Sequence, residues 1–246
     1  MTGDADFTFC VCTFNSEKTI EKCLKSIRQI APGSKILVID HESGDRTREI
    51  ARDYDAEVIS ENVGLGHARQ LGFENVLTKY LVFVDSDVEI KGSDFTRQAI
   101  VAMENPEVGA VVGMSLGHRF AYGLPASLLV LRHGDFHGKI VPDYIDARET
   151  FFIQRRLDSL GLETRYIFEA MKHESQFRKF KPEWEGANTR ILPSSMSKEL
   201  SFTARVILLL TLNSRSPVNV VYMPIFYLKF LRGFLDPKPW LKLRRT

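Results

Sequence analysis

The sequence is poor in cysteine and has no long apolar run. Its 246 residues include three cysteines, an odd and small number that does not make a disulfide framework and that favours reduced thiols in a cytosolic setting. No stretch of about 18 uninterrupted apolar residues occurs, so we expect no membrane-spanning helix. The N-terminal MTGDADFTF lacks a basic region followed by an apolar one, so we expect no signal peptide. These absences argue against a disulfide-stabilised scaffold and an integral membrane protein.

The chain also lacks the composition of a disordered protein, and its charge is unevenly distributed. It is 44% hydrophobic and 26% charged, which is typical of a folded globular chain. Residues 1–171 carry 19 Lys and Arg against 26 Asp and Glu, a net charge of −7, whereas residues 172–246 carry 14 against 5, a net charge of +9. We therefore predict two domains, 1–171 and 172–246, that face different surroundings.

Short apolar runs alternate with helical patterns along the first part of the chain. The expected strands are residues 7–13, 35–40, 57–60, 80–84, 109–114 and 163–168. Because helical patterns separate them, we predict an α/β fold with a Rossmann-like, mainly parallel sheet and helices on both faces. Residues 115–147 are rich in glycine and proline, and we expect an irregular functional loop or lid there.

Acidic side chains follow two of the expected strands. In LVFVDSDVEI, Asp85 and Asp87 come directly after a buried apolar run, and Asp40 ends ILVID. The carboxyl ends of parallel strands meet at one edge of a sheet, where α/β folds bind ligands. Two acidic strand ends at one edge are costly without a cation or hydrogen-bond donors, and carboxylates are ligands for Mg²⁺ or Mn²⁺. The pattern predicts a divalent-cation site.

A glycine-rich turn precedes the third expected helix, at NVGLGHAR, residues 62–69. Glycine permits close approach of a ligand to the backbone, a helix N-terminus favours an anion, and Arg69 adds positive charge. Beside two acidic strand ends, this turn indicates a phosphorylated ligand.

Four motifs in this order resemble family-2 glycosyltransferases. They are FTFCVCTFNSEKTIEKCLKSI, ILVIDHESGDRT, NVGLGHARQLGFENVLTKYLVFVDSD and VGAVVG, and ARETFFIQRRLDSLG continues the resemblance more loosely. The resemblance implies a GT-A fold, with residues 1–115 as the nucleotide-sugar-binding half, 116–171 as the acceptor and lid half, and 172–246 as a basic, mainly helical region. It also implies a nucleotide-sugar donor and a divalent cation, Mg²⁺ or Mn²⁺, held by a D-x-D motif.

The resemblance assigns roles to individual positions. Those that would bind the donor are Thr13, Phe14, Asn15, Asp40, Arg69, Asp85 and Ser86. Asp87, with Asp85 and His173, would hold the cation. Glu149 falls at the acidic motif that supplies the catalytic base, and Arg156 falls at the family's helical arginine.

Three departures from the family pattern leave alternatives open. Where many members have two aspartates after the second strand, this chain has Asp40 and His41, and the second aspartate often reads uracil, so the preferred base is open. Thr150 follows Glu149 where a Glu-Asp pair is common, so the base could instead be Asp143 or Asp146. An ionised phosphate acceptor would need no base. The Q-x-x-R-W signature of processive synthases is absent, which favours transfer of a single sugar.

The basic C-terminal segment, residues 200–246, interleaves aromatic and aliphatic side chains with cations. This mixture suits helices that lie in a membrane interface, and it predicts peripheral binding at the cytoplasmic membrane face. A lipid-linked acceptor, such as a polyprenyl phosphate or a lipid-linked glycan, would fit. The alternatives are an ordinary helical subdomain with a basic wet face, and a homodimer interface. Nucleic acid is not expected, because no recognition signature is present and the N-terminal part is acidic.

The sequence is therefore interpreted as a metal-dependent, inverting glycosyltransferase. Two alternatives remain: a sugar nucleotidyltransferase, which would release diphosphate from a nucleoside triphosphate, and a non-catalytic nucleotide-sugar-binding scaffold. His41 and Thr150 are the residues that favour the scaffold.

Overall fold

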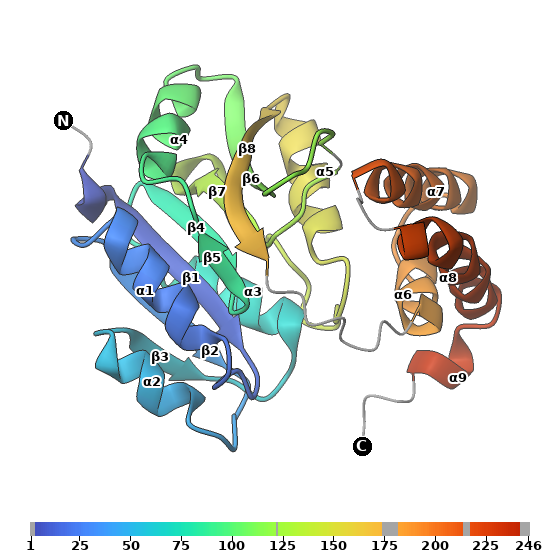
Figure 1. Ribbon diagram of the computed structural model, residues 1–246, viewed down its shortest axis with the longest axis horizontal. Coiled ribbons are helices and arrows are strands. Elements are labelled where there is room, and N and C mark those ends of the chain that lie inside the picture. The colour runs from blue at the N-terminus through green and yellow to red at the C-terminus, as the bar shows by residue number, and fades with distance from the viewer. Residues whose placement is uncertain (1–2, 122, 174–181, 214–216, 242–246) are drawn as a thin grey trace. The chain divides into compact units, whose positions relative to one another are not determined.

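The computed structural model describes residues 3–121, 123–173, 182–213 and 217–241, and it divides the chain into two compact units (Figure 1). The first unit comprises Met1–Leu116, Leu124–Ile145 and Glu149–Ser175, and the second comprises Gly117–Gly123, Asp146–Arg148 and Gln176–Thr246. The predicted domains 1–171 and 172–246 stay a prediction, since the second unit also takes two short segments from earlier in the chain.

The first unit is built on one eight-stranded sheet. Its strands are β1 (Phe7–Thr13), β2 (Lys35–Asp40), β3 (Glu57–Ser60), β4 (Tyr80–Asp85), β5 (Val88–Ile90), β6 (Val108–Ser115), β7 (Leu128–Arg132) and β8 (Glu163–His173). The spatial order is β3-β2-β1-β4-β7-β6-β8-β5. Only β7 and β5 run antiparallel to their neighbours, so the sheet is mainly parallel, as predicted.

Helices cover both faces of this sheet. They are α1 (Ile20–Ile30), α2 (Thr47–Asp53), α3 (Leu65–Glu74), α4 (Phe95–Met103) and α5 (Thr150–Leu160), with 3₁₀ turns at Asp4–Asp6 and His133–Asp135. Residues of α1, α2 and α4 share one buried cluster with Phe9 and Val11 of β1. The alternate residue Cys10 points to the other face, where it lies against α3. Strands buried on both sides explain the uninterrupted apolar runs in the sequence.

The expectation of an irregular segment over residues 115–147 is wrong in its middle. Leu128–Arg132 forms β7, which pairs antiparallel with both β4 and β6 at the centre of the sheet. The glycines and prolines on either side conceal this five-residue strand, because its conformation depends on partners far away in the sequence.

The register of the strands sets the position of the acidic residues. Thr13 lies opposite Asp40 on the neighbouring β2, and Cys12 lies opposite Asp85 on β4. The carboxyl ends of three adjacent strands therefore place Asp40 and Asp85 at the same edge of the sheet.

The second unit is helical, as predicted. Its helices are α6 (Pro182–Arg190), α7 (Met196–Asn213), α8 (Pro217–Leu235) and α9 (Lys238–Leu241). Gly233 of α8 lies against the backbone of Glu183 in α6, and the Arg148 guanidinium lies 3.0 Å from a carboxylate oxygen of Glu199 in α7. Among the described helices, none combines the length and the apolar character that a membrane crossing requires.

Gly66, in the first turn of α3, lies so close to neighbouring backbone that it leaves no room for a side chain. Its N–H donates to the carbonyl of Ile145 at 2.8 Å, and a Cβ at this position would collide with the carbonyl oxygens of Pro142 and Ile145. Backbone atoms cannot move aside as a flexible side chain can. We predict that Gly66→Ala lowers the free energy of unfolding by about 1–3 kcal/mol through overpacking.

Gly134 is the matched control, because its added Cβ would meet no atom within 4 Å and its backbone is not left-handed. Denaturant unfolding of both variants checks the prediction. Equal stabilities for Gly66→Ala and Gly134→Ala would contradict the close contact between α3 and the 142–145 segment.

Candidate active site

Three potential metal ligands meet beyond the carboxyl end of β4. The ligand atoms of Asp85, Asp87 and His173 all lie within 4.8 Å of one another. His173 is the last residue of β8, and it reaches this position because it pairs with Val88 of β5. Its Nε2 lies 3.0 Å from Asp87 Oδ1. Two carboxylates and an imidazole form a donor set that fits Mg²⁺ or Mn²⁺.

The local electrostatics agree with a cation site. Burial lowers the pKa of His173, but the hydrogen bond with Asp87 and the charges of Asp87 and Asp85 outweigh burial, so the pKa is raised above its usual value. The raised pKa of His173 indicates an excess of negative charge around its imidazole at this edge of the sheet. The side chains are about one-third exposed (34% for Asp85, 27% for Asp87 and 30% for His173), which leaves them accessible to an ion.

A buried arginine lies behind these carboxylates. The side chain of Arg69, on α3, is 2% exposed, and its Nη2 lies 2.7 Å from Asp85 Oδ1. Its Nε is 3.7 Å from Glu149 Oε1, and its guanidinium lies 4.8 Å from the centroid of the Phe83 ring. Burial lowers the pKa of Arg69, but the charges of Cys12, Asp85 and Glu149 outweigh it and raise the pKa. The arginine therefore stays a cation inside the unit.

Part of the hydrogen-bonding capacity of Arg69 is unused. Within the described residues, its buried Nε and Nη1 have no hydrogen-bond partner. Buried donors without partners are rare because leaving one unsatisfied costs about 1–3 kcal/mol. Nε is still within ion-pair distance of Glu149 Oε1, so the unused capacity lies mainly on Nη1.

The structure also brings Glu149 to this site. Glu149 is 8% exposed, directly precedes α5, and shares Arg69 with Asp85. The preceding residue, Arg148, has a φ of 62°, a strained conformation for a side chain of this size. Whether Glu149 is the catalytic base stays a prediction.

The two alternative base candidates have different surroundings. Asp143 forms ion pairs with Lys139 and with His67, whose Nδ1 lies 3.3 Å from Asp143 Oδ1. Hydrogen bonds from Lys139 and then His67 lower the pKa of Asp143, which makes it a weaker proton acceptor. Asp146 belongs to the second unit.

Asp40 holds together the loops at the same edge of the sheet through hydrogen bonds inside the protein. Its carboxylate is fully buried and accepts hydrogen bonds from the Thr13 hydroxyl at 2.7 Å and from the Ser43 backbone and hydroxyl at 2.8 and 2.6 Å. Both carboxylate oxygens therefore have partners inside the protein. Any effect of Asp40 on a donor would pass through the loop residues that it holds.

The loops after β1 and β2 are tied to each other. Asn15, with a φ of 48°, donates its N–H to the Ser43 hydroxyl at 2.8 Å and accepts the Gly44 N–H at 3.0 Å. Phe14 lies beside them and is 55% exposed. The Ser86 hydroxyl donates to the Ser16 hydroxyl at 3.0 Å, which links the turn between Asp85 and Asp87 to the same loops.

The glycine-rich turn serves a different purpose from the one its sequence indicates. The N–H groups of Val63 and Gly64 donate to Glu61 Oε2 at 2.8 and 2.9 Å, and the Gly66 N–H donates to Ile145. These groups are already used within the protein and are not open to a phosphate. Glu61 was missed by the sequence analysis. Its position three residues before a glycine at a helix start is the signal that could have found it.

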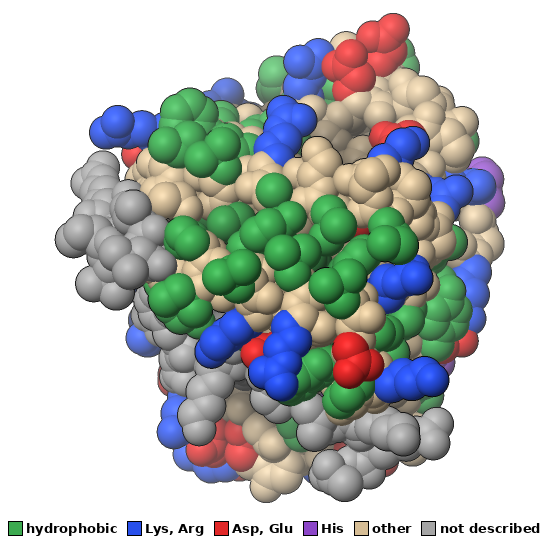
Figure 2. Space-filling model, turned by 90° about the vertical axis from the view of Figure 1, so that its right-hand side faces the viewer, with side chains coloured by type: hydrophobic (Ala, Val, Ile, Leu, Met, Phe, Trp, Pro, Cys, Tyr) green, Lys and Arg blue, Asp and Glu red, His purple; other side chains and the backbone are tan. Residues whose placement is uncertain are grey.

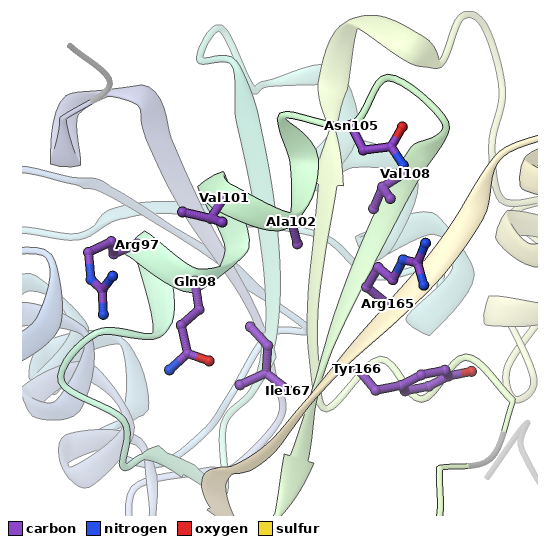
Figure 3. Close-up of a pocket in the computed structure, with 9 residues that line it drawn as sticks. All are labelled: Arg97, Gln98, Val101, Ala102, Asn105, Val108, Arg165, Tyr166 and Ile167. Atoms are coloured by element: carbon purple, nitrogen blue, oxygen red, sulfur yellow. The ribbon is translucent and has the colours of Figure 1, made fainter.

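A separate cavity lies between α4 and β8 and has a volume of about 420 Å³ (Figure 3). It is lined by Arg97, Gln98, Val101, Ala102, Asn105, Val108, Arg165, Tyr166 and Ile167. Its two arginines form ion pairs with Asp94 and Glu163. The lining residues of β8 come from the amino-terminal half of the strand, whereas His173 lies at its carboxyl end. The cavity is therefore distinct from the candidate active site.

Comparison with known proteins identifies the chain. A model of the family described as "Glycosyl transferase family 2" matches residues 8–133, just over half of the chain. The chain belongs to glycosyl transferase family 2. The matched residues run from β1 to the residue after β7, and they include Asp85, which ends β4, and Asp87, which follows it.

Curated relatives of this family-2 chain match it over short regions. A 4,4'-diaponeurosporenoate glycosyltransferase from Staphylococcus haemolyticus (strain JCSC1435) is 34% identical over 95 residues, which cover 35% of this chain and 25% of that protein. A teichoic acid poly(glycerol phosphate) polymerase from Staphylococcus epidermidis (strain ATCC 35984 / DSM 28319 / BCRC 17069 / CCUG 31568 / BM 3577 / RP62A) is 33% identical over 92 residues, covering 34% and 13%. The chain thus spans a quarter or less of these two relatives.

Solved structures share the fold. The mannosyltransferase PcManGT from Pyrobaculum calidifontis, in complex with GDP-Man and Mn²⁺, has a TM-score of 0.65 at 16% identity and covers 96% of this chain and 71% of its own. A glucosyl-3-phosphoglycerate synthase from Mycobacterium tuberculosis, with Mn²⁺, UDP and glucosyl-3-phosphoglycerate, has a TM-score of 0.56 at 18% identity, covering 69% and 72%. The predicted GT-A fold of this family-2 chain is confirmed.

Proposed function

We propose that this chain transfers a single sugar from a nucleotide-sugar donor to an acceptor, with a divalent cation and with inversion at the anomeric carbon. The observation that carries the proposal is the meeting of Asp85, Asp87 and His173 beside Arg69, a buried cation that pairs with Asp85 and Glu149. A nucleotide diphosphate offers oxygens for a cation held there. The fold neighbours solved with GDP-Man and Mn²⁺ and with UDP and Mn²⁺ support this class of ligand.

We assign a different role in the reaction to each group of residues at this edge of the sheet. Asp85, Asp87 and His173 would hold Mg²⁺ or Mn²⁺, which when bound would offset the charge that grows on the departing diphosphate. Arg69 fixes the orientation of Asp85 and adds positive charge beside the cation ligands. Thr13, the last residue of β1, and Asn15, in the loop that follows, would border the nucleoside.

Glu149 would act on the acceptor. A carboxylate can take the proton of an attacking hydroxyl, a step worth about 10²–10⁴-fold in rate. Attack from the face opposite the departing diphosphate inverts the anomeric carbon. Arg69 lies between Glu149 and Asp85 and thus between the base and the side of the site that would hold the leaving group.

A lipid-linked acceptor at the cytoplasmic membrane face is the second part of the proposal, and the exposed face of α7 and α8 supports it. Side chains on this face are apolar yet open to solvent, and Lys and Arg surround them (Figure 2). The apolar members, which we call the apolar patch, are Leu208, Leu212, Ile225, Leu228 and Leu235, with exposed fractions of 46–72%.

The charge around the apolar patch favours an anionic membrane surface as its partner. Arg205 of α7 and Lys229 and Arg232 of α8 are exposed, and Arg232 lies 5.8 Å from the Trp240 ring. Each cation near an anionic membrane contributes about 1 kcal/mol, and apolar side chains enter the interface below the headgroups. The polyprenyl phosphate or lipid-linked glycan that we propose as acceptor would be met at this surface.

Asp87→Ala tests the cation site. We predict that the variant keeps its fold and loses Mn²⁺-dependent binding of UDP and GDP, because one of three ligand side chains is gone. Isothermal titration calorimetry with either nucleotide, with Mn²⁺ and with EDTA, measures the loss. Asp94→Ala is the control, since Asp94 is an exposed carboxylate paired with Arg97. Normal Mn²⁺-dependent binding by Asp87→Ala would contradict the metal role.

Glu149→Gln tests the base. We predict that the variant binds the donor normally but hydrolyses or transfers its sugar about 10²–10⁴-fold more slowly, because the amide cannot accept the proton. Asp143→Asn and Asp146→Asn are measured beside it. Unchanged turnover in Glu149→Gln, with a large loss in one of the other two variants, would move the role of base to that residue.

Leu228→Glu together with Leu235→Glu tests the membrane surface. We predict that this double variant binds vesicles of phosphatidylcholine and phosphatidylglycerol about tenfold more weakly or worse, because two apolar side chains can no longer enter the interface. Leu77→Glu, at a leucine of the first unit that is 90% exposed, is the control. Loss of a dimer in sedimentation, with vesicle binding unchanged, would assign the patch to self-association instead.

A further inference from the structure

The strand β8 has a neighbouring strand on one side only over much of its length. On one side, its amino-terminal half pairs with β6. On the other side, β5 pairs only with the last residues of β8, 171–173. Within the part of the chain that the structure describes, no further strand borders β8 on that side. The open edge of a strand is a template on which another strand can pair.

The cavity between α4 and β8 lies beside this open edge. Arg165, Tyr166 and Ile167 of β8 all line the cavity. In Figure 3, Ile167 faces α4 and the Tyr166 ring points away from it, as expected for successive residues of a strand. Because a cavity separates α4 from this part of β8, the helix leaves room for a further strand beside the open edge.

Apolar side chains are exposed at the same place. Phe168 of β8 is 44% exposed, and Val101 of α4, which lines the cavity, is 55% exposed. Ile167, between the cavity and the open edge, is half-buried. Apolar side chains beside an open strand edge promote association with another chain unless something covers them. The edge therefore has the composition of an interaction surface.

The order of side chains along this edge is self-complementary. Arg165 and Glu169 lie equally far from Ile167 on either side, and so do Tyr166 and Phe168. If two copies of β8 run antiparallel with Ile167 opposite Ile167, each Arg165 faces Glu169 of the second copy. In the same register, each Tyr166 faces Phe168 of the second copy. Opposite charges and pairs of aromatic rings are favourable cross-strand partners.

The charges select this register over its neighbour. Centring the pair one residue earlier, on Tyr166, would place Glu163 opposite Glu169, and like charges directly opposite are unfavourable. Arg165 now pairs with Glu163 of its own strand at 2.8 Å, and both side chains are more than half exposed. An exposed ion pair of this kind contributes little to stability, so Arg165 can exchange it for a carboxylate of another chain.

We propose that the open edge of β8 pairs with the same edge of a second copy of this chain, antiparallel and centred on Ile167. Such a dimer uses one surface twice about a two-fold axis and joins two sheets into one. Charges and kinks commonly protect an edge strand from association, and Glu169, with a φ of 57°, ends the regular part of the edge. Here the charges attract a copy in one register. The inference goes beyond the proposed function, because it concerns neither the donor nor the acceptor.

Charge reversal tests the pairing in solution. Arg165→Glu places two carboxylates opposite each other, and Glu169→Arg places two guanidinium groups opposite each other. We expect either variant to raise the dissociation constant of the dimer about tenfold or more, because each puts like charges together at two symmetric positions. The double variant, with both reversals, should restore the dimer.

Sedimentation velocity of the full chain over a range of concentrations measures these dissociation constants. Glu57→Arg is the matched control, because Glu57 is an exposed carboxylate on β3, the strand at the other edge of the sheet, and pairs with Lys35. This control should leave the dimer unchanged.

Several outcomes would overturn the inference. They are a monomeric unsubstituted chain, a dimer that survives both single reversals, and a double variant that stays monomeric. Loss of the dimer in Leu228→Glu with Leu235→Glu, but not in the β8 variants, would place the interface on the apolar patch instead. Should a reversal variant fail to fold, Ile167→Cys decides: mild oxidation links two copies through facing thiols if Ile167 lies on the two-fold axis, and it leaves monomers if the inference is wrong.

Discussion

A buried guanidinium holds the acidic groups of the candidate site in place. Arg69 lies inside the first unit and contacts Asp85 on one side and Glu149 on the other. The desolvation of a buried cation is costly unless anions surround it, so the arginine and the carboxylates depend on one another. The strand carrying Asp85 and the helix that follows Glu149 are far apart in the sequence. Arg69 connects the two elements, because its guanidinium forms ion pairs with both Asp85 and Glu149.

The carboxylates at this edge of the sheet differ in what they can do, although their sequence patterns are alike. Asp40 and Asp85 each end a parallel strand. Asp40 is fully buried with hydrogen bonds to both oxygens, and it stiffens two loops. Asp85 is one-third exposed and stands beside two other potential ligands. Burial and local partners, more than residue type, decide which carboxylate braces the loops and which can meet a ligand.

The elements that the sequence predicted well are those whose cause is local. The bounds expected for β1, β2 and β3 agree with the structure. In β1 and β2 the cause is an apolar run that is buried almost throughout. The strand β7 was missed, since its pairing partners lie about 20 to 50 residues away in the sequence and its neighbours are rich in glycine. For the same reason, the hydrogen bond between the His41 imidazole and the Glu61 carboxylate was invisible. In the sequence alone, His41 was a departure from a family pattern, and only the fold supplies its partner.

The position of His173 has a consequence for how the protein matures. Two of the three potential ligands lie on one short turn, but the third arrives on β8, the last strand of the sheet in chain order. During synthesis, a chain of which only the first half has emerged contains Asp85 and Asp87 but not His173. Long-range pairings of this kind form late. The proposed cation site would therefore be complete only once β8 has paired with β5.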